Sequence, residues 1–167
     1  MKLLLNATID TLEQVKQLIG FASGPLYNQP SAHSQSGIGR HVRHILDHFW
    51  ALQLGMEQGV IDYNQRQRDS ELEQQPELAL ARCQQLIEWL DGQIEQDNSL
   101  QVISEISVHE QQNIEVSSLL SRELLYLINH TIHHIAYAKL LGQQLGLQFD
   151  AALGLAPSTA SYLRGQG

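Results

Sequence analysis

The chain has 167 residues, which is enough for one domain that buries a sizeable core. Its formal net charge of -8 argues against nucleic acid as a partner. No apolar run is long enough to cross a membrane, and the apolar run in the N-terminal MKLLLNATID is too short for a secretory signal. The single cysteine, Cys83, excludes an internal disulfide and indicates a cytoplasmic protein.

Eight histidines stand beside ten lysines and arginines, an unusual balance, and six of the eight lie in two short clusters. The periodicity of apolar residues predicts a first helix over residues 8–21 and a second over residues 37–58. The intervening segment is rich in Pro, Gly and Ser, so it is predicted to be a loop, and we interpret His33 within it as solvated.

The first histidine cluster lies on the second predicted helix. His41, His44 and His48 fall within about 60° of one another, at the edge of the apolar side of this helix. Solvation alone is a poor explanation for three histidines beside a core stripe. One of them could bind a metal while the others hold hydrogen-bonded positions around it.

A polar segment follows the second helix. Tyr63, Arg66, Arg68 and Asp69 lie in it, and we favour a solvated connection with local ion pairs. The alternative is an anion-contacting loop over a pocket, because arginine presents a planar fork to carboxylates.

Pro76 is expected in the first turn of a third helix. The apolar stripe of that helix consists of Leu80, Cys83, Ile87, Leu90 and Ile94. Cys83 is therefore interpreted as core packing. Alternation within residues 101–118 predicts a short β-hairpin with His109 near its tip. Near the C-terminus, Pro157 is expected to begin a last helical turn whose Tyr162 and Leu163 pack back on the core.

The second histidine cluster lies on the longest predicted helix, residues 121–146. At about 100° per residue, one narrow strip carries Glu123, His130, His134, Tyr137 and Leu141. The spacing of four between His130 and His134 places both imidazoles on one face, which suits two ligands of one divalent metal. His133 points elsewhere, toward solvent or a position behind the ligands.

Four amphipathic helices with short connections predict an all-α four-helix bundle over residues 1–167, with the short hairpin before the last long helix. Metal sites in such bundles form between facing helices. One histidine of the second helix, together with His130 and His134, would give three nitrogen ligands and leave positions open for water or substrate. Imidazole ligands suit a divalent ion such as zinc, nickel or iron.

Two segments carry a resemblance to a known family. IGRHVRHILDHF contains a His-Ile-Leu-Asp element, and HTIHHIAYAKLLGQQLGL contains the H-x-x-x-H pair followed by a run ending in Leu-Gly. In this order they resemble the DinB/YfiT-like family of metal-dependent four-helix bundles. The resemblance implies that His44, His130 and His134 are the ligands. Geometry alone does not choose His44 over His41, which could also be a fourth ligand or a proton carrier.

The resemblance implies a metal-dependent enzyme that performs thiol transfer or hydrolysis on a small molecule, with a low-molecular-weight thiol as one candidate partner. His41 or His48 would act as the general base, since histidine titrates in the useful range. Glu123 could orient a ligand or carry protons, or merely favour the first turn of its helix. Tyr126 and Tyr137 could line a pocket, although we favour core packing for both.

Two further hypotheses use the same residues. A metal- or ligand-binding module without turnover would have a site closed by His41. A purely structural protein would keep all its histidines as buried hydrogen-bonding groups, which is the weakest reading because each unpaired buried nitrogen costs about 1–3 kcal/mol. Self-association as a homodimer through an exposed apolar helix face fits any of the three.

Overall fold

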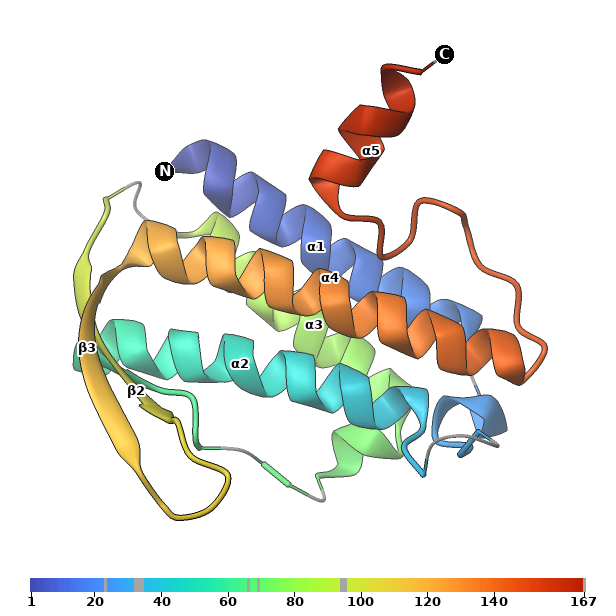
Figure 1. Ribbon diagram of the computed structural model, residues 1–167, viewed down its shortest axis with the longest axis horizontal. Helices are drawn as coiled ribbons and strands as arrows, with labels where there is room; N and C mark the ends of the chain where they lie inside the picture. The colour runs from blue at the N-terminus through green and yellow to red at the C-terminus, as the bar shows by residue number, and fades with distance from the viewer. Residues whose placement is uncertain (23, 32–34, 66, 69, 94–95, 167) are drawn as a thin grey trace.

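The computed structural model covers residues 1–167 and describes all of them except residues 23, 32–34, 66, 69, 94–95 and 167. In this described part, four long helices pack side by side, a three-stranded sheet lies at one end of them, and a short helix follows near the C-terminus (Figure 1). The helices are α1 (Lys2–Phe21), α2 (Ile38–Gln58), α3 (Pro76–Asp91), α4 (Leu120–Gln144) and α5 (Pro157–Arg164). The strands are β1 (Val60–Asp62), β2 (Ser99–Glu105) and β3 (Asn113–Leu119), and the 3-10 turns are η1 (Gly24–Tyr27) and η2 (Glu71–Glu73).

The predicted fold class, an all-α four-helix bundle, is wrong because the described chain contains a mixed β-sheet in the order β1-β2-β3. The expected hairpin is present as β2 and β3, which pair antiparallel, and His109 lies in the segment that joins them. The additional strand β1 pairs in parallel with β2, so that Ile61 lies opposite Val102. Three residues are too few to show alternation, which is why the sequence indicated a polar connection there.

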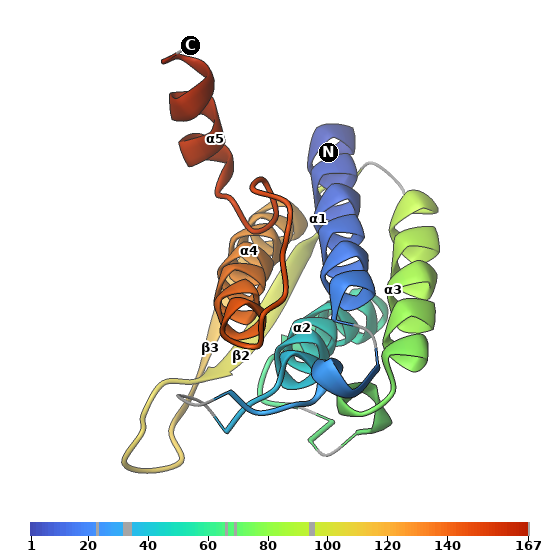
Figure 2. The ribbon, with the colours of Figure 1, turned by 90° about the vertical axis from the view of Figure 1, so that its right-hand side faces the viewer.

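Helix α4 packs against both α1 and α2, and α1 also packs against α3 (Figures 1 and 2). One hydrophobic cluster joins these helices, and Leu12, Phe49, Leu86 and Leu124 are completely buried in it. Burying each such side chain stabilises the fold by about 1.5–3 kcal/mol. The interpretation of Cys83 as core packing is confirmed, whereas Ile94 lies outside the described residues. None of the described helices is both long and apolar enough to span a bilayer.

Two glycines of α2 allow other segments to approach its backbone closely. A Cβ at Gly39 would collide with the backbone carbonyl of Glu73 in η2, and one at Gly55 would collide with Ile61 in β1. Glycine is therefore required at both positions if η2 and β1 are to lie against α2. These approaches place η2 against the first turn of α2, next to the histidines, and β1 against its last turn.

The prediction that the C-terminal turn packs back on the core is wrong. Helix α5 forms from Pro157, as expected, but none of its residues is buried, and Tyr162 is 65% exposed. The helix projects away from the others in both views (Figures 1 and 2). The segment before it is held at Leu153, which is buried and whose carbonyl accepts a hydrogen bond from the Lys139 ammonium at 3.1 Å.

Candidate metal centre

Three histidines from two helices converge between α2 and α4. Within the described residues, His44, His130 and His134 each offer one nitrogen, and these nitrogens all lie within 4.8 Å of one another. Helices α2 and α4 run in opposite directions (Figure 1). Residues of rising number on α2 therefore meet residues of falling number on α4. Accordingly, His41 contacts His134 and His44 contacts His130.

The nitrogen spacing fits a divalent ion. The Nε2 atoms of His44 and His130 are 3.1 Å apart. Two nitrogens that each lie about 2.0–2.1 Å from a tetrahedral ion are separated by about 3.3 Å, so a small shift would allow both to coordinate one ion. All three rings are half-buried, which limits competition from water while leaving one side accessible. Neutral imidazoles are ligands for zinc, nickel and iron alike.

His41 lies beside this group and supports one of its members. Its Nδ1 is 3.2 Å from the Nδ1 of His134, and one of these two nitrogens must donate to the other. Its Nε2 is buried and has no hydrogen-bond partner among the described residues. Burial, followed by the neighbouring His134, Arg40 and Arg43, lowers the pKa of His41 to about 4. His41 is therefore neutral near pH 7 and able to orient the His134 ring.

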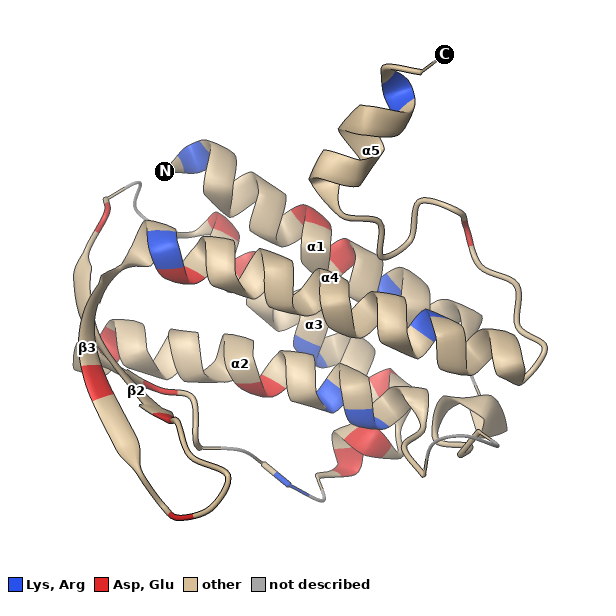
Figure 3. Cartoon of the chain, viewed as in Figure 1, with Lys and Arg blue, Asp and Glu red and all other residues tan. Residues whose placement is uncertain are grey.

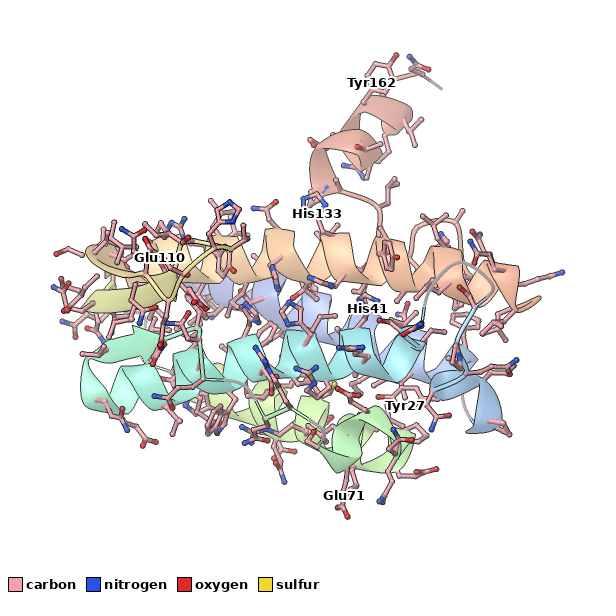
Figure 4. The ribbon with its side chains drawn as sticks, turned by 60° about the horizontal axis from the view of Figure 1, so that its bottom comes forward. Tyr27, His41, Glu71, Glu110, His133 and Tyr162 are labelled. Carbon is pink, nitrogen blue, oxygen red and sulfur yellow. The ribbon has the colours of Figure 1, made fainter. Side chains whose placement is uncertain are left out.

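Figure 4 separates His41 from a nearby exposed histidine. His41 lies between α2 and α4, whereas His133 points away from α2 on the outer side of α4. His133 is exposed, so its solvent position is confirmed. The contrast follows from the helix period, since His133 is rotated by about 100° from His134.

His48 lies deeper between the same helices. Its side chain is buried, and its Nδ1 is 3.0 Å from the carbonyl oxygen of His44. A carbonyl only accepts, so Nδ1 carries the proton in the neutral ring and Nε2 is the acceptor. The ring centroid of His48 lies 4.1 Å from that of His130 and 4.6 Å from that of His44. It is therefore in contact with two of the three converging histidines.

Tyrosine rings enclose the histidines on two sides. Tyr63 stacks on His48 with 5.3 Å between the ring centroids, and Tyr126 stacks on His130 with 5.4 Å between them. The ring centroid of Tyr137 lies 4.9 Å from that of His41. Tyr63 is 7% exposed, so its interpretation as part of a solvated connection is wrong. It lies directly after β1, and the pairing of that strand with β2 carries it inside. Tyr137 is 47% exposed, so core packing is wrong for it, whereas Tyr126 is partly buried against the core.

Glu123 belongs to a separate buried cluster. It is 1% exposed, and its carboxylate accepts hydrogen bonds from the Tyr63 hydroxyl at 2.7 Å and the Ser118 hydroxyl at 2.6 Å. Arg122 approaches the same carboxylate at 3.2 Å. Burial and the Glu123 charge raise the pKa of Tyr63, so its hydroxyl remains a donor. Glu123 reaches the histidines through Tyr63 and His48.

A buried ion-pair cluster on α2 escaped the sequence analysis. The Arg43 guanidinium donates to Asp47 at 2.7 Å and to Glu73 at 2.8 Å. Burial lowers the pKa of Arg43, but the two hydrogen-bonded carboxylates outweigh it and raise that pKa overall. The spacing of four between Arg43 and Asp47 was a usable signal for half of this cluster.

An open cavity of about 490 Å³ borders the histidine group. Its lining includes His41, His44, His134, Arg40 and Arg68. Of the residues in the polar connection after β1, Arg68 thus reaches the pocket mouth. Arg66, Asp69 and the loop residue His33 lie outside the described residues.

Comparison with known proteins leaves the family open. No family model matches the chain, and no solved structure matches it significantly. The chain is 29% identical over 109 residues to FK506-binding protein 5 of Rhizopus delemar. That alignment covers 64% of this chain and 28% of the relative, so the chain spans less than a third of the length of the curated protein it matches.

Proposed function

We propose that this chain is a metal-dependent enzyme of the DinB/YfiT-like type, which binds one divalent ion through His44, His130 and His134. The observation that carries the proposal is the convergence of three imidazole nitrogens within 4.8 Å beside an open cavity. Three protein ligands leave coordination positions for water or substrate, as in catalytic zinc sites, whereas structural sites are usually closed by four.

A divalent ion held there would lower the pKa of a water or thiol that it binds and polarise a substrate oxygen. The protein supplies the groups around that chemistry. His48 presents Nε2 as a proton acceptor because its Nδ1 is committed to the His44 carbonyl. His41 orients His134 and lines the cavity, and its lowered pKa of about 4 makes it a weaker base than an ordinary histidine. Glu123 holds Tyr63 against His48, which makes it a positioning residue.

The proposed reactions are transfer of a low-molecular-weight thiol and hydrolysis, on a small molecule that fits a cavity of about 490 Å³. We place the protein in the cytoplasm because it has a single cysteine, which is buried. We also propose a homodimer, because Leu125 and Leu140 of α4 are 52% and 58% exposed. Nucleic acid and membrane lipid are not among the proposed partners.

A second candidate is a metal-binding module without turnover, favoured by one observation. The buried Nε2 of His41 has no partner among the described residues, and His41 already contacts His134. A shift of His41 toward the ion would add a fourth nitrogen and close the site. Cobalt substitution distinguishes the candidates, because an open site changes its visible spectrum when a small anion such as azide is added, and a closed site does not.

The test of turnover uses chain stripped of metal and then loaded with zinc, nickel or iron(II). Two assays are run: transfer of a small thiol to chlorodinitrobenzene, and hydrolysis of p-nitrophenyl acetate. We expect one of them to depend on added metal in the wild type and in His133→Ala, and to be lost in His130→Ala. Equal rates in the metal-free and metal-loaded wild type would remove the case for a metalloenzyme.

A further inference from the structure

The cavity beside the histidines has a basic mouth in an acidic protein. The chain carries 18 acidic and 10 basic residues, yet Arg40, Arg43 and Arg68 all line this one cavity, with Glu73 as its carboxylate. Basic segments at the start of α2 and in the connection between β1 and η2 are visible in the same part of Figure 3. Positive charge is therefore concentrated in the lining of the cavity beside the histidines.

The three arginines are not equivalent. Arg43 is buried and its guanidinium is held by Asp47 and Glu73. Arg40 and Arg68 are exposed and form no ion pair with any of the described residues. Three arginines and Glu73 give the cavity lining a net charge of +2, and counting Asp47, which pairs with Arg43 behind the lining, reduces it to +1 before a divalent ion contributes. Its available cations are Arg40 and Arg68.

The two arginines come from different segments of the fold. Arg40 lies in the first turn of α2, one residue before His41 and one turn before His44. Arg68 precedes η2, whose Glu73 carbonyl lies against Gly39 at the start of α2, and it lines the same cavity as Arg40. An arginine on each of two segments can grip one acid group from two sides, and a guanidinium matches carboxylate and phosphate oxygens with paired hydrogen bonds.

We propose that Arg40 and Arg68 form an anion-binding subsite, and that the substrate is a small molecule with a carboxylate or phosphate group. The acid group is held at the cavity mouth, and the reacting part of the molecule extends to His44 and His134. This inference rests on the proposed function for the role of the histidines. It selects anionic substrates over neutral molecules of the same shape, because the net positive lining gains nothing from an uncharged group.

The experiment compares probes of matched shape and different charge. Succinate, its uncharged diamide succinamide, and phenylphosphonate are titrated into the full chain by calorimetry, with and without one equivalent of zinc. The proteins are the wild type, Arg40→Gln, Arg68→Gln, the double variant, and Arg164→Gln as an exposed-arginine control on α5. Metal content and thermal unfolding are recorded on each sample, so that loss of folding or of metal is seen directly.

We expect succinate or phenylphosphonate to bind more tightly than succinamide. Each single substitution should weaken that binding about fivefold, and the double variant more, because an exposed charge pair contributes up to about 1 kcal/mol. Arg164→Gln should match the wild type, and added salt should weaken binding.

Unchanged anion affinity in the double variant, or equal affinity for succinate and succinamide, would overturn the subsite. Failure of the metal proposal has a different signature. If the wild-type chain takes up no zinc, the proposal of a metalloenzyme is contradicted. Arginine-dependent anion binding in the same metal-free sample would still support the subsite.

Discussion

Helix α2 contributes to two polar clusters, a largely buried arginine cluster and a half-buried histidine group, whose members are paired in different ways. In the arginine cluster, Arg43 meets Asp47 and Glu73, so every charge faces its opposite within 2.8 Å. In the histidine group, ring nitrogens face one another. The Nε2 atoms of His44 and His130 are 3.1 Å apart, and the Nδ1 atoms of His41 and His134 are 3.2 Å apart. The first arrangement is complete and reads as structural. In the second, each short contact joins two imidazoles, and the convergence of His44, His130 and His134 is the arrangement from which we propose a metal site.

The largest expected effect tests the structural half of this comparison. Arg43→Met should lower the free energy of unfolding by about 3–5 kcal/mol, because it leaves the buried carboxylate of Asp47 and the partly buried one of Glu73 without their cation. Urea unfolding followed by circular dichroism measures it. Arg82→Met, which removes a partly buried arginine hydrogen-bonded to Gln53, is the control and should cost about 1 kcal/mol. Equal losses of unfolding free energy in Arg43→Met and Arg82→Met would contradict a structural role for the Arg43 ion pairs.

The next prediction concerns His41, which contacts one ligand of the proposed metal site. His41→Phe should weaken zinc binding about 10–100-fold, because His134 loses the partner that fixes its ring. Competition with a zinc chelator measures the affinity. Full loss of binding in this variant would instead make His41 a ligand.

The Glu123 prediction tests whether this carboxylate stabilises the fold without taking part in metal binding. Glu123→Gln should lower the free energy of unfolding by about 1–3 kcal/mol, since one buried acceptor becomes a donor toward Tyr63 and Ser118. Metal content should stay at the wild-type value. Glu115→Gln, at an exposed position of β3, is the matched control and should change neither quantity. Loss of metal in Glu123→Gln would place the carboxylate in the site.

Cys83 shows what burial does to a single thiol in the hydrophobic core. Burial raises the pKa of its thiol to about 12. The folded chain then holds this proton more tightly than the unfolded chain, whose pKa is near 9. The resulting stabilisation is present below pH 9 and is lost as the pH rises from 9 toward 12. The difference in unfolding free energy between wild type and Cys83→Ala should therefore shrink over that range, whereas a constant difference would contradict the shift.

The sequence predicted those features that depend on local periodicity. Helical spacing alone placed His130 and His134 on one face, and the alternation before α4 predicted the hairpin. The resemblance to the DinB/YfiT-like family singled out His44, and its nitrogen does lie with that pair. Whether the three bind a metal stays a prediction.

Features that depend on contacts between distant segments were not predictable in the same way. β1 becomes a strand because it pairs with β2, and that pairing buries Tyr63. Arg68 lines the cavity together with Glu73 of η2, whose backbone lies against Gly39 of α2. The outward course of α5 is likewise set by where the preceding segment is anchored, at Leu153, and not by the apolar character of Tyr162.

The central claim is that His44, His130 and His134 bind one divalent ion, and elemental analysis of tag-free protein tests it most directly. Wild type, His44→Ala, His130→Ala, His134→Ala and the exposed control His133→Ala are loaded with zinc, nickel or iron(II) and then desalted. We expect about one metal per chain in the wild type and in His133→Ala, and almost none in the other three, since losing a ligand should cost more than the roughly 100-fold of a supporting residue. A wild type that retains no metal, or ligand variants that retain it fully, would contradict the claim.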